Sequence, residues 1–396
     1  NISRFVPGTI IDLENYVCAY PEIKVSKGKG SKIKVEWAEA LFRNLSTREK
    51  GKRDQIYDKY FYGVGDEFIP DGGRQRIFST FKWQAGRFMQ LLIKTGREPL
   101  ILQQILLKET HYPYQFKGQF RCSDKEFTKV IPICQRALEM CSHDTYMDCP
   151  YYERLMYVGD SRLEALITYV YTGDPRLPKK AIALFDYSRK NSGYTQSRYP
   201  CWDQVIIPPF SLWWVGMVYD FLMWQDDKEF IRQRLKGVHA VLEAFVAGLN
   251  EKGLLTAPQG WNFVDWVEGW DEGVPPEGRF GINAAINLQF ILALQQAAQI
   301  DEYLGENEMA LRWKRLAQRV SQAVIKFFWD AQRGLLADDL AKKYFSQHVQ
   351  CLALLTHILP QKKKQKVIKG LLTRKDLAPC SIYFSFYLIE TLAQLR

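Results

Sequence analysis

The chain has 396 residues, of which 47% are hydrophobic and 25% charged, with 26 glycines and 17 prolines. This composition is too apolar for a disordered chain and too mixed for a collagen or a coiled coil. Lysine and arginine number 54 against 44 acidic residues, and this net charge of +10 is dispersed along the chain, so we predict no nucleic-acid partner.

The longest apolar runs, such as residues 210–218, are shorter than the roughly 18–20 residues that a membrane span needs, so we predict no span. The eight cysteines and five histidines show no zinc-binding spacing, and we predict neither a metal nor an organic cofactor. The even number of cysteines permits disulfides. Because the chain opens on Asn1 and ends in a helix-like run, we expect it to be part of a longer protein.

Residues 1–122 are predicted to form an all-β, sandwich-like domain. Apolar and polar residues alternate at 31–37 and 88–94, a period typical of half-buried strands. Turn-forming clusters at 70–73 and 94–99 punctuate the pattern.

Residues 123–396 are predicted to form a mainly α domain, an (α/α)6 toroid of helical hairpins. Ser123 or Asp124 suits a helix N-cap, and strongly apolar helical segments then alternate with amphipathic ones, as two concentric layers require. Six hairpins would need upwards of about 300 residues, so we expect the last hairpin to be incomplete. The predicted helices lie at 161–171, 178–188, 212–223, 230–246, 284–303, 310–328, 346–357 and 382–395.

The densest polar cluster lies at residues 147–160, where Asp148, Glu153 and Asp160 are interleaved with tyrosines. If this segment is helical, Glu153 and Asp160 share a face, because two turns span about 7.2 residues. Desolvation and like-charge repulsion would then raise the pKa of one carboxyl, as a general acid requires. The alternative is a capped helix start with a solvated glutamate.

A second cluster, Trp261-Asn-Phe-Val-Asp-Trp266, lies in a Gly/Pro-rich loop. Two tryptophans that flank Asp265 favour sugar recognition, with ring faces for C–H surfaces and a carboxylate for hydroxyls. The alternative is a buried aromatic corner in which Asp265 caps a turn. The pair Trp213-Trp214, taken alone, is more typical of a core.

The motif Asp148-Cys-Pro-Tyr-Tyr-Glu-Arg-Leu-Met-Tyr-Val-Gly-Asp160 resembles the bacterial α-L-rhamnosidases of glycoside hydrolase family 78. Further blocks resemble the same family in the same order, and their context strengthens the assignment. They are residues 195–200, 206–214, 261–266, 345–348 and 381–387, preceded by 81–88, which resembles the last β-sandwich before the barrel.

The resemblance implies an (α/α)6 barrel that hydrolyses terminal α-L-rhamnosides with inversion. The family's general acid falls on Glu153, and Asp148 and Asp160 match acidic residues that bind the sugar or hold the acid in place. The other candidate substrate-binding residues are Tyr157, Trp213, Trp214, Asp265 and Trp266.

An inverting glycosidase also needs a second carboxylate about 6.5–9.5 Å from the acid. The family's catalytic base is a glutamate in a later block that this sequence does not contain, so we name no base. The expected partner is a rhamnose-containing glycoside or polysaccharide, and a periplasmic or secreted bacterial location is favoured over a cytoplasmic one. Two alternatives stay open: a related glycosidase for another sugar, and a catalytically silent carbohydrate-binding protein.

Overall fold

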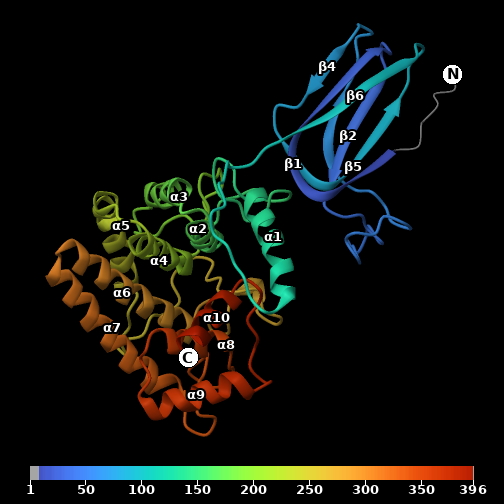
Figure 1. The fold of residues 1–396 in the computed structure, drawn as a ribbon. Helices are drawn as coiled ribbons and strands as arrows, with labels where there is room; N and C mark the ends of the chain where they lie inside the picture. Colours follow the sequence, from blue (N-terminus) through green and yellow to red (C-terminus); the bar gives the residue numbers. More distant parts are fainter. Residues whose placement is uncertain (1–8, 396) are drawn as a thin grey trace. The chain divides into compact units, whose positions relative to one another are not determined.

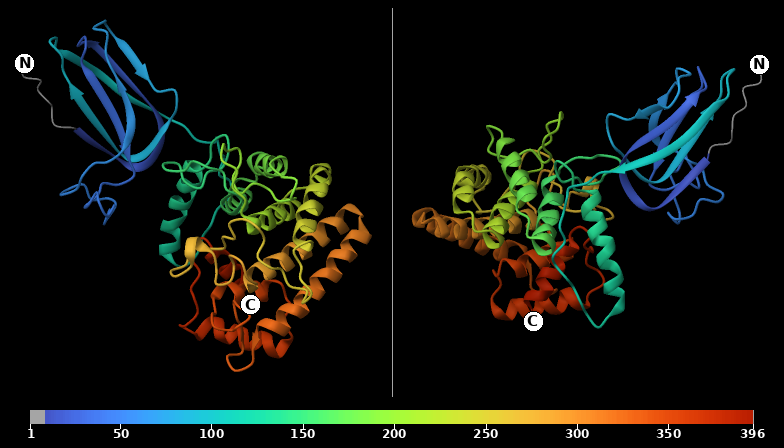
Figure 2. Two further views of the ribbon diagram at one scale, coloured as in Figure 1. Left: turned by 180° about the vertical axis from the view of Figure 1, so that it is seen from behind. Right: turned by 45° about the horizontal axis from the view of Figure 1, so that its top comes forward.

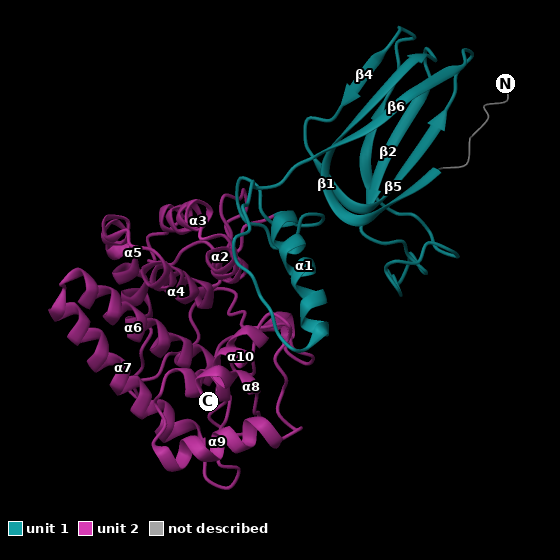
Figure 3. Cartoon of the chain, viewed as in Figure 1, with its two compact units in different colours: residues 1–154 teal, residues 155–396 magenta. Residues whose placement is uncertain are grey.

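The computed structural model describes residues 9–395 and comprises two compact units, residues 1–154 and 155–396 (Figure 3). Helix α1 (Lys125–Met140) begins just past the predicted domain boundary, yet it belongs to the first unit. The division of the chain therefore falls one helix and one loop later than the change in sequence pattern at residue 123, and that boundary stays a prediction.

The first unit contains one antiparallel sheet of six strands, which curls around its longest strand (Figures 1 and 2). Its strand order is β3-β2-β5-β1-β4, with β6 also paired to β1. The strands are β1 (Thr9–Lys27), β2 (Lys32–Ala38), β3 (Val64–Phe68), β4 (Arg76–Ser79), β5 (Gln84–Lys94) and β6 (Leu100–Glu109).

The curl follows from the way in which β1 changes partners along its length. Its first part pairs with β5, from Thr9 to Ala19, and its second part pairs with β6, from Ala19 to Lys27. The register shifts between Asp12 and Val17, as expected of a bulge that bends a strand. The strands predicted at 31–37 and 88–94 are confirmed as β2 and β5, whereas a two-layered sandwich stays a prediction.

The second unit consists mainly of helices, as the sequence predicted. The described part of the whole chain contains ten α-helices, and none of them is long and apolar enough to cross a membrane. The helices of this unit are α2 (Val158–Thr172), α3 (Arg176–Tyr187), α4 (Pro208–Trp224), α5 (Lys228–Val246), α6 (Ala284–Leu304), α7 (Asn307–Phe328), α8 (Gln347–Leu355), α9 (Gln361–Thr373) and α10 (Ser385–Gln394).

The helices of this unit pack as an inner row and an outer row. Successive even-numbered helices from α2 to α10 contact each other, and α3, α5, α7 and α9 pack against them. Helices α4 and α6 are apolar on nearly every side, while α5 and α7 bury only one face. An all-round apolar helix must be covered on every side, so the sequence pattern fixes which helices lie inside. Closure of the inner row into a toroid stays a prediction.

The loops that precede the inner helices are joined to one another by hydrogen bonds, which gather the N-terminal ends of these helices. A parallel bridge between Ser346 and Ala378 also links the start of α8 to the segment before α10. The bonds run from Val158 N to Ser197 O (2.9 Å), from Trp261 N to Ile206 O (3.0 Å) and from Asn283 Nδ2 to Asp338 O (3.1 Å).

One buried amide in α6 holds a neighbouring loop. Asn287 Oδ1 accepts from Leu255 N (2.8 Å), and Asn287 Nδ2 donates to Leu255 O (3.2 Å) and Asn283 O (2.8 Å). We expect Asn287→Ala to lower the free energy of unfolding by about 2–4 kcal/mol, because it leaves buried backbone groups without partners. Urea denaturation checks this. The control is Gln318→Ala on the exposed face of α7, which should change stability by no more than about 0.5 kcal/mol; equal effects of the two changes would contradict the assignment.

Candidate active site

The first half of the acidic motif forms turns rather than a helix. Residues 148–157 contain no helical residue, and Arg154 has a φ of 56°, which an α-helix does not allow. Helix α2 begins only at Val158. The condition under which Glu153 and Asp160 would share a helical face is therefore not met, because the left-handed Arg154 between them interrupts the helical periodicity.

The turn that carries Glu153 is anchored to the sheet of the first unit. The Tyr151 hydroxyl donates to Trp37 O (2.8 Å), and Trp37 is completely buried. Arg154 Nη1 donates to Trp83 O (3.1 Å), and its guanidinium lies over the Trp83 ring. Glu153 itself is exposed and Asp148 half-buried. The sheet thus fixes the backbone on both sides of the candidate acid.

Tyr157 and Asp160 belong to the second unit, at the start of α2. Tyr157 is buried at the N-cap position, and its hydroxyl accepts a hydrogen bond from Arg198 Nη1 (2.8 Å). Asp160 is half-buried in the first turn, where a carboxylate is stabilised by the helix dipole. The predicted convergence of Glu153 with Asp160 and Asp265 stays a prediction.

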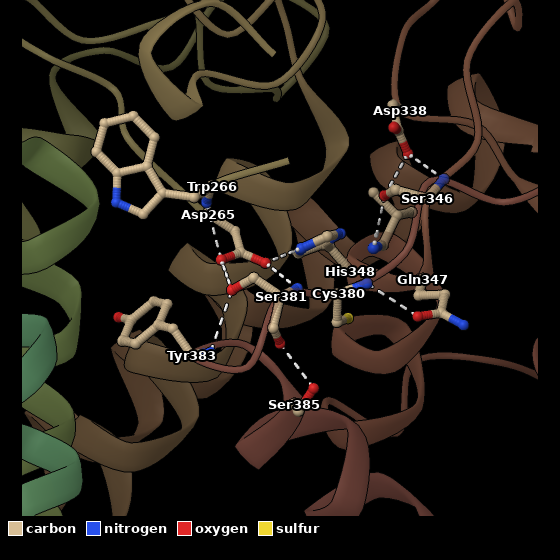
Figure 4. Close-up of polar contacts among 11 residues, drawn as sticks. Asp265, Trp266, Asp338, Ser346, Gln347, His348, Cys380, Ser381, Tyr383 and Ser385 are labelled. Carbon is tan, nitrogen blue, oxygen red and sulfur yellow. Dashed lines mark hydrogen bonds and ion pairs between the residues drawn. The ribbon is translucent and has the colours of Figure 1, made fainter. Parts of the chain in front are cut away.

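Asp265 is the centre of a buried hydrogen-bond network (Figure 4). Oδ2 accepts from His348 Nε2 (2.7 Å) and Ser381 N (2.8 Å), and Oδ1 accepts from the Ser381 hydroxyl and from Trp266 N (2.9 Å). Burial raises the pKa of this carboxyl, but the hydrogen bonds from His348 and Ser381 outweigh it, so that the pKa lies below its usual value. Asp265 is therefore an ionised group enclosed by the protein.

The bond from Trp266 N to Asp265 agrees with the alternative in which Asp265 caps a turn, but the aromatic corner is not wholly buried. Both carboxylate oxygens are occupied by protein donors, so we do not carry forward a direct contact between Asp265 and a sugar. Trp266, the next residue, is 63% exposed, and its backbone N–H is fixed by the Asp265 carboxylate. Asp265 thereby positions an aromatic ring that faces solvent.

His348, in the first turn of α8, is completely buried between the rings of Trp270 and Phe384. Burial lowers the pKa of this imidazole, although the contact with Asp265 acts in the opposite direction. A neutral imidazole that donates from Nε2–H to Asp265 Oδ2 accounts for this hydrogen bond. The ring is therefore a structural donor to the carboxylate rather than an acid of the site.

Trp213 and Trp214 lie in the core of the helical unit. The Trp213 ring stacks on Tyr387 with centroids 4.5 Å apart, and Trp214 Nε1 donates to Ile182 O (3.0 Å). Their exposed fractions are 1% and 0%. A ring with both faces covered offers no platform to a sugar, so we do not retain these two residues as substrate-binding groups.

Tyr383 was not singled out by the sequence, although it lies in one of the blocks that resemble the family. Its ring packs so closely over Gly159 in α2 that a Cβ there would come within 2.5 Å of the hydroxyl. Burial, followed by the nearby Tyr387, Asp160 and Asp265, raises the pKa of this phenol. Tyr383 thus joins the start of α2 to the Asp265 network. The sequence did not indicate this link, because Tyr383 is far from Gly159 and Asp265 in the chain.

Asp338, like Asp265, lies near the N-terminal end of α8, but it accepts fewer hydrogen bonds than Asp265. Oδ1 accepts from Ser346 N (3.1 Å) and Ser346 Oγ (2.9 Å), whereas Oδ2 has no hydrogen-bond partner among residues 9–395. Burial raises the pKa of Asp338 to about 7. In the same range of residues, no group of three or more His, Cys, Asp or Glu side chains is arranged to hold a metal ion.

Residues 115–377 match the family model described as the bacterial alpha-L-rhamnosidase 6 hairpin glycosidase domain. This match spans about two thirds of the chain, and the chain therefore belongs to this family, as its motifs predicted. No curated protein sequence matches the chain.

Several solved structures share the fold. A family 78 rhamnosidase of Bacillus sp. GL1 superposes with a TM-score of 0.84 at 20% identity, over 99% of this chain and 41% of that one. A rhamnosidase from Klebsiella oxytoca with rhamnose bound gives 0.81 at 18% identity, over 99% and 76%. An α-L-rhamnosidase from Dictyoglomus thermophilum gives 0.78 at 20%, over 98% and 43%. The chain thus spans less than half the length of the Bacillus and Dictyoglomus proteins.

The setting of Asp338 predicts a distinct pH dependence of stability. The folded protein keeps the Asp338 proton up to a pH of about 7, while the unfolded chain releases it near 4. The contribution of Asp338 to the free energy of unfolding is therefore fully present below the pKa of the unfolded chain. It is lost as the pH rises through the pKa of the folded protein.

We expect wild type to lose roughly 2–3 kcal/mol relative to Asp338→Asn between pH 5 and 7, because the amide stays neutral. Urea denaturation at pH 5, 6, 7 and 8 measures the difference, with the exposed Asp144→Asn as a matched control. A difference that does not vary with pH would contradict the protonation of Asp338.

Proposed function

We propose that the protein is a glycoside hydrolase that removes terminal α-L-rhamnose from glycosides or polysaccharides. The observation that carries the proposal is the family match over residues 115–377, which includes the motif from Asp148 to Asp160. The rhamnosidases with the same fold support this substrate class, and the Klebsiella oxytoca structure contains rhamnose.

In the proposed mechanism, Glu153 is the general acid and protonates the glycosidic oxygen as the bond breaks. A water molecule then attacks the opposite face of the sugar with help from a second carboxylate, which gives inversion. The turn anchored by Tyr151 holds the backbone of the acid. Asp148 and Asp160 are proposed to hold the acid or bind the sugar hydroxyls.

The sugar is proposed to lie against two aromatic rings, Trp266 and Tyr157. Rhamnose carries a methyl group in place of a hydroxymethyl group, and this methyl favours an apolar wall. Trp266 supplies an exposed indole that its backbone bond to Asp265 holds in place. Tyr157, fixed by Arg198, is proposed as the second aromatic group.

We expect Glu153→Gln to fold normally but to lose about 10²–10⁴-fold in kcat on natural rhamnosides, because their leaving groups need a proton. Aryl rhamnosides with good leaving groups should lose much less activity. Steady-state kinetics on both substrate types measure this, with exposed Glu126→Gln in α1 as the control.

Natural-substrate activity within a few-fold of wild type would exclude Glu153 as the acid. Rhamnose binding without turnover in wild-type protein would favour the carbohydrate-binding alternative, and cleavage of other aryl glycosides but not rhamnosides would favour a different sugar. NMR determination of the anomer that is released first separates inversion from retention.

Hydrolysis is expected to be independent of metal ions, because proton transfer between carboxyl groups and water suffices for glycoside cleavage. Dialysis of the protein against EDTA should leave kcat/KM unchanged. Loss of activity that Ca²⁺ or Zn²⁺ restores would show that an ion takes part.

A further inference from the structure

Two cysteines lie in contact with each other beside the Asp265 network. Cys351 is completely buried in α8, and Cys380 is partly buried in the loop before α10. Figure 4 shows Cys380 next to Ser381, which donates two hydrogen bonds to Asp265. Both cysteines are free thiols in this structure. The even number of cysteines in the sequence permits disulfides, but it does not indicate which residues are paired.

The backbone brings the two residues together independently of their side chains. The loop before α10 runs along the first turn of α8, because Gln347 N donates to Ala378 O (2.9 Å) and Cys380 N donates to Gln347 Oε1 (2.9 Å). Cys351 follows Gln347 by four residues, about one helical turn, so both lie on the same face of α8. Cys380 is therefore held beside the helix face that carries Cys351.

The thiols of the pair interact directly. Contact with the Cys351 thiol, followed by burial, raises the pKa of the Cys380 thiol. Cys380 is thus protonated at neutral pH and reacts slowly with an oxidant, as buried thiols generally do. The neighbouring Cys351 nevertheless gives it a partner, because a mixed disulfide formed at Cys380 can be resolved by the second thiol without any large movement of the chain.

We propose that Cys351 and Cys380 form a disulfide under oxidising conditions, and that this bond locks the loop before α10 to α8. The oxidant is a small disulfide of the glutathione type. The Cys380 thiolate attacks one sulfur of the oxidant and releases one thiolate, and the Cys351 thiolate then attacks the Cys380 sulfur and releases the second. The released thiolates take up the two protons that the cysteines lose, and two electrons pass from the cysteine pair to the oxidant.

The bond reinforces the part of the unit that encloses Asp265. His348 lies three residues before Cys351, Ser381 directly follows Cys380, and both His348 and Ser381 donate to the Asp265 carboxylate. A disulfide covalently joins the two segments that carry these donors. The two cysteines are 29 residues apart, so the bond also encloses α9 in a covalent loop, which restricts the unfolded chain.

Tryptic mapping under non-reducing conditions tests the pairing. Trypsin releases Cys351 in peptide 344–362 and Cys380 in peptide 376–396, and each of these peptides contains a single cysteine. Folded wild-type protein is incubated with oxidised glutathione at pH 8, the remaining thiols are alkylated, and the digest is analysed by mass spectrometry. We expect the two peptides to be recovered as a disulfide-linked pair that dithiothreitol separates. Because this measurement uses the wild-type chain, it does not depend on the folding of a variant.

The stability of the oxidised protein provides a second measurement. We expect oxidation to raise Tm by about 5–10 °C, as a bond that closes a loop of this length typically does, and dithiothreitol to reverse the rise. Cys380→Ser should abolish the rise. The matched control Cys134→Ser, which changes an exposed cysteine of α1, should keep it.

Three results would each overturn the proposal. One is recovery of both peptides as alkylated or singly glutathionylated species without the linked pair. Another is linkage of either cysteine to a different cysteine of the chain. The third is a rise in Tm on oxidation that persists in Cys380→Ser. None of these measurements uses rhamnoside hydrolysis, so the outcome is independent of the proposed function.

Discussion

The ionised Asp265 carboxylate is the interaction on which the candidate active-site end of the helical unit depends. A charge without exposure to water is tolerated only when partners replace its hydration, and Asp265 has four protein donors. Two of its partners, His348 and Ser381, lie 83 and 116 residues away in the chain. The start of α8 and the segment before α10 are consequently held by one group, and removing it would leave several buried polar groups without partners.

Two buried aspartates at this end of the unit have pKa values shifted in opposite directions. Both are desolvated, which raises the pKa of a carboxyl. Asp265 recovers the lost hydration from donors on both oxygens, whereas Asp338 receives hydrogen bonds on Oδ1 only. The donors on both oxygens therefore lower the pKa of Asp265, whereas deeper burial with fewer donors, together with the nearby Asp339, raises the pKa of Asp338 to about 7.

The proposed chemistry is distributed over two structural contexts. The candidate acid Glu153 lies on a turn that is anchored to a curled sheet through Tyr151 and Trp37. The aromatic groups proposed for the sugar belong to loops and helix starts of the second unit. The packing of the sheet around Trp37 therefore helps to fix the position of the turn that carries Glu153, although Trp37 itself is completely buried.

The sequence by itself determined the elements and the family. Period-two alternation located β2 and β5, and all-round apolarity marked α4 and α6 as inner helices, because these patterns depend on local spacing alone. The motif from Asp148 to Asp160 and the ordered blocks behind it identified the family, since residue order along the chain carries that information directly.

Only the tertiary structure decided what each candidate residue does. The left-handed Arg154 excludes a continuous helix from Glu153 to Asp160, Trp213 and Trp214 are buried in the core, and Asp265 is enclosed by hydrogen bonds from the protein. These outcomes depend on contacts between residues far apart in the chain. Whether a tryptophan faces a sugar or a neighbouring helix is set by what packs against it, and no local spacing encodes that.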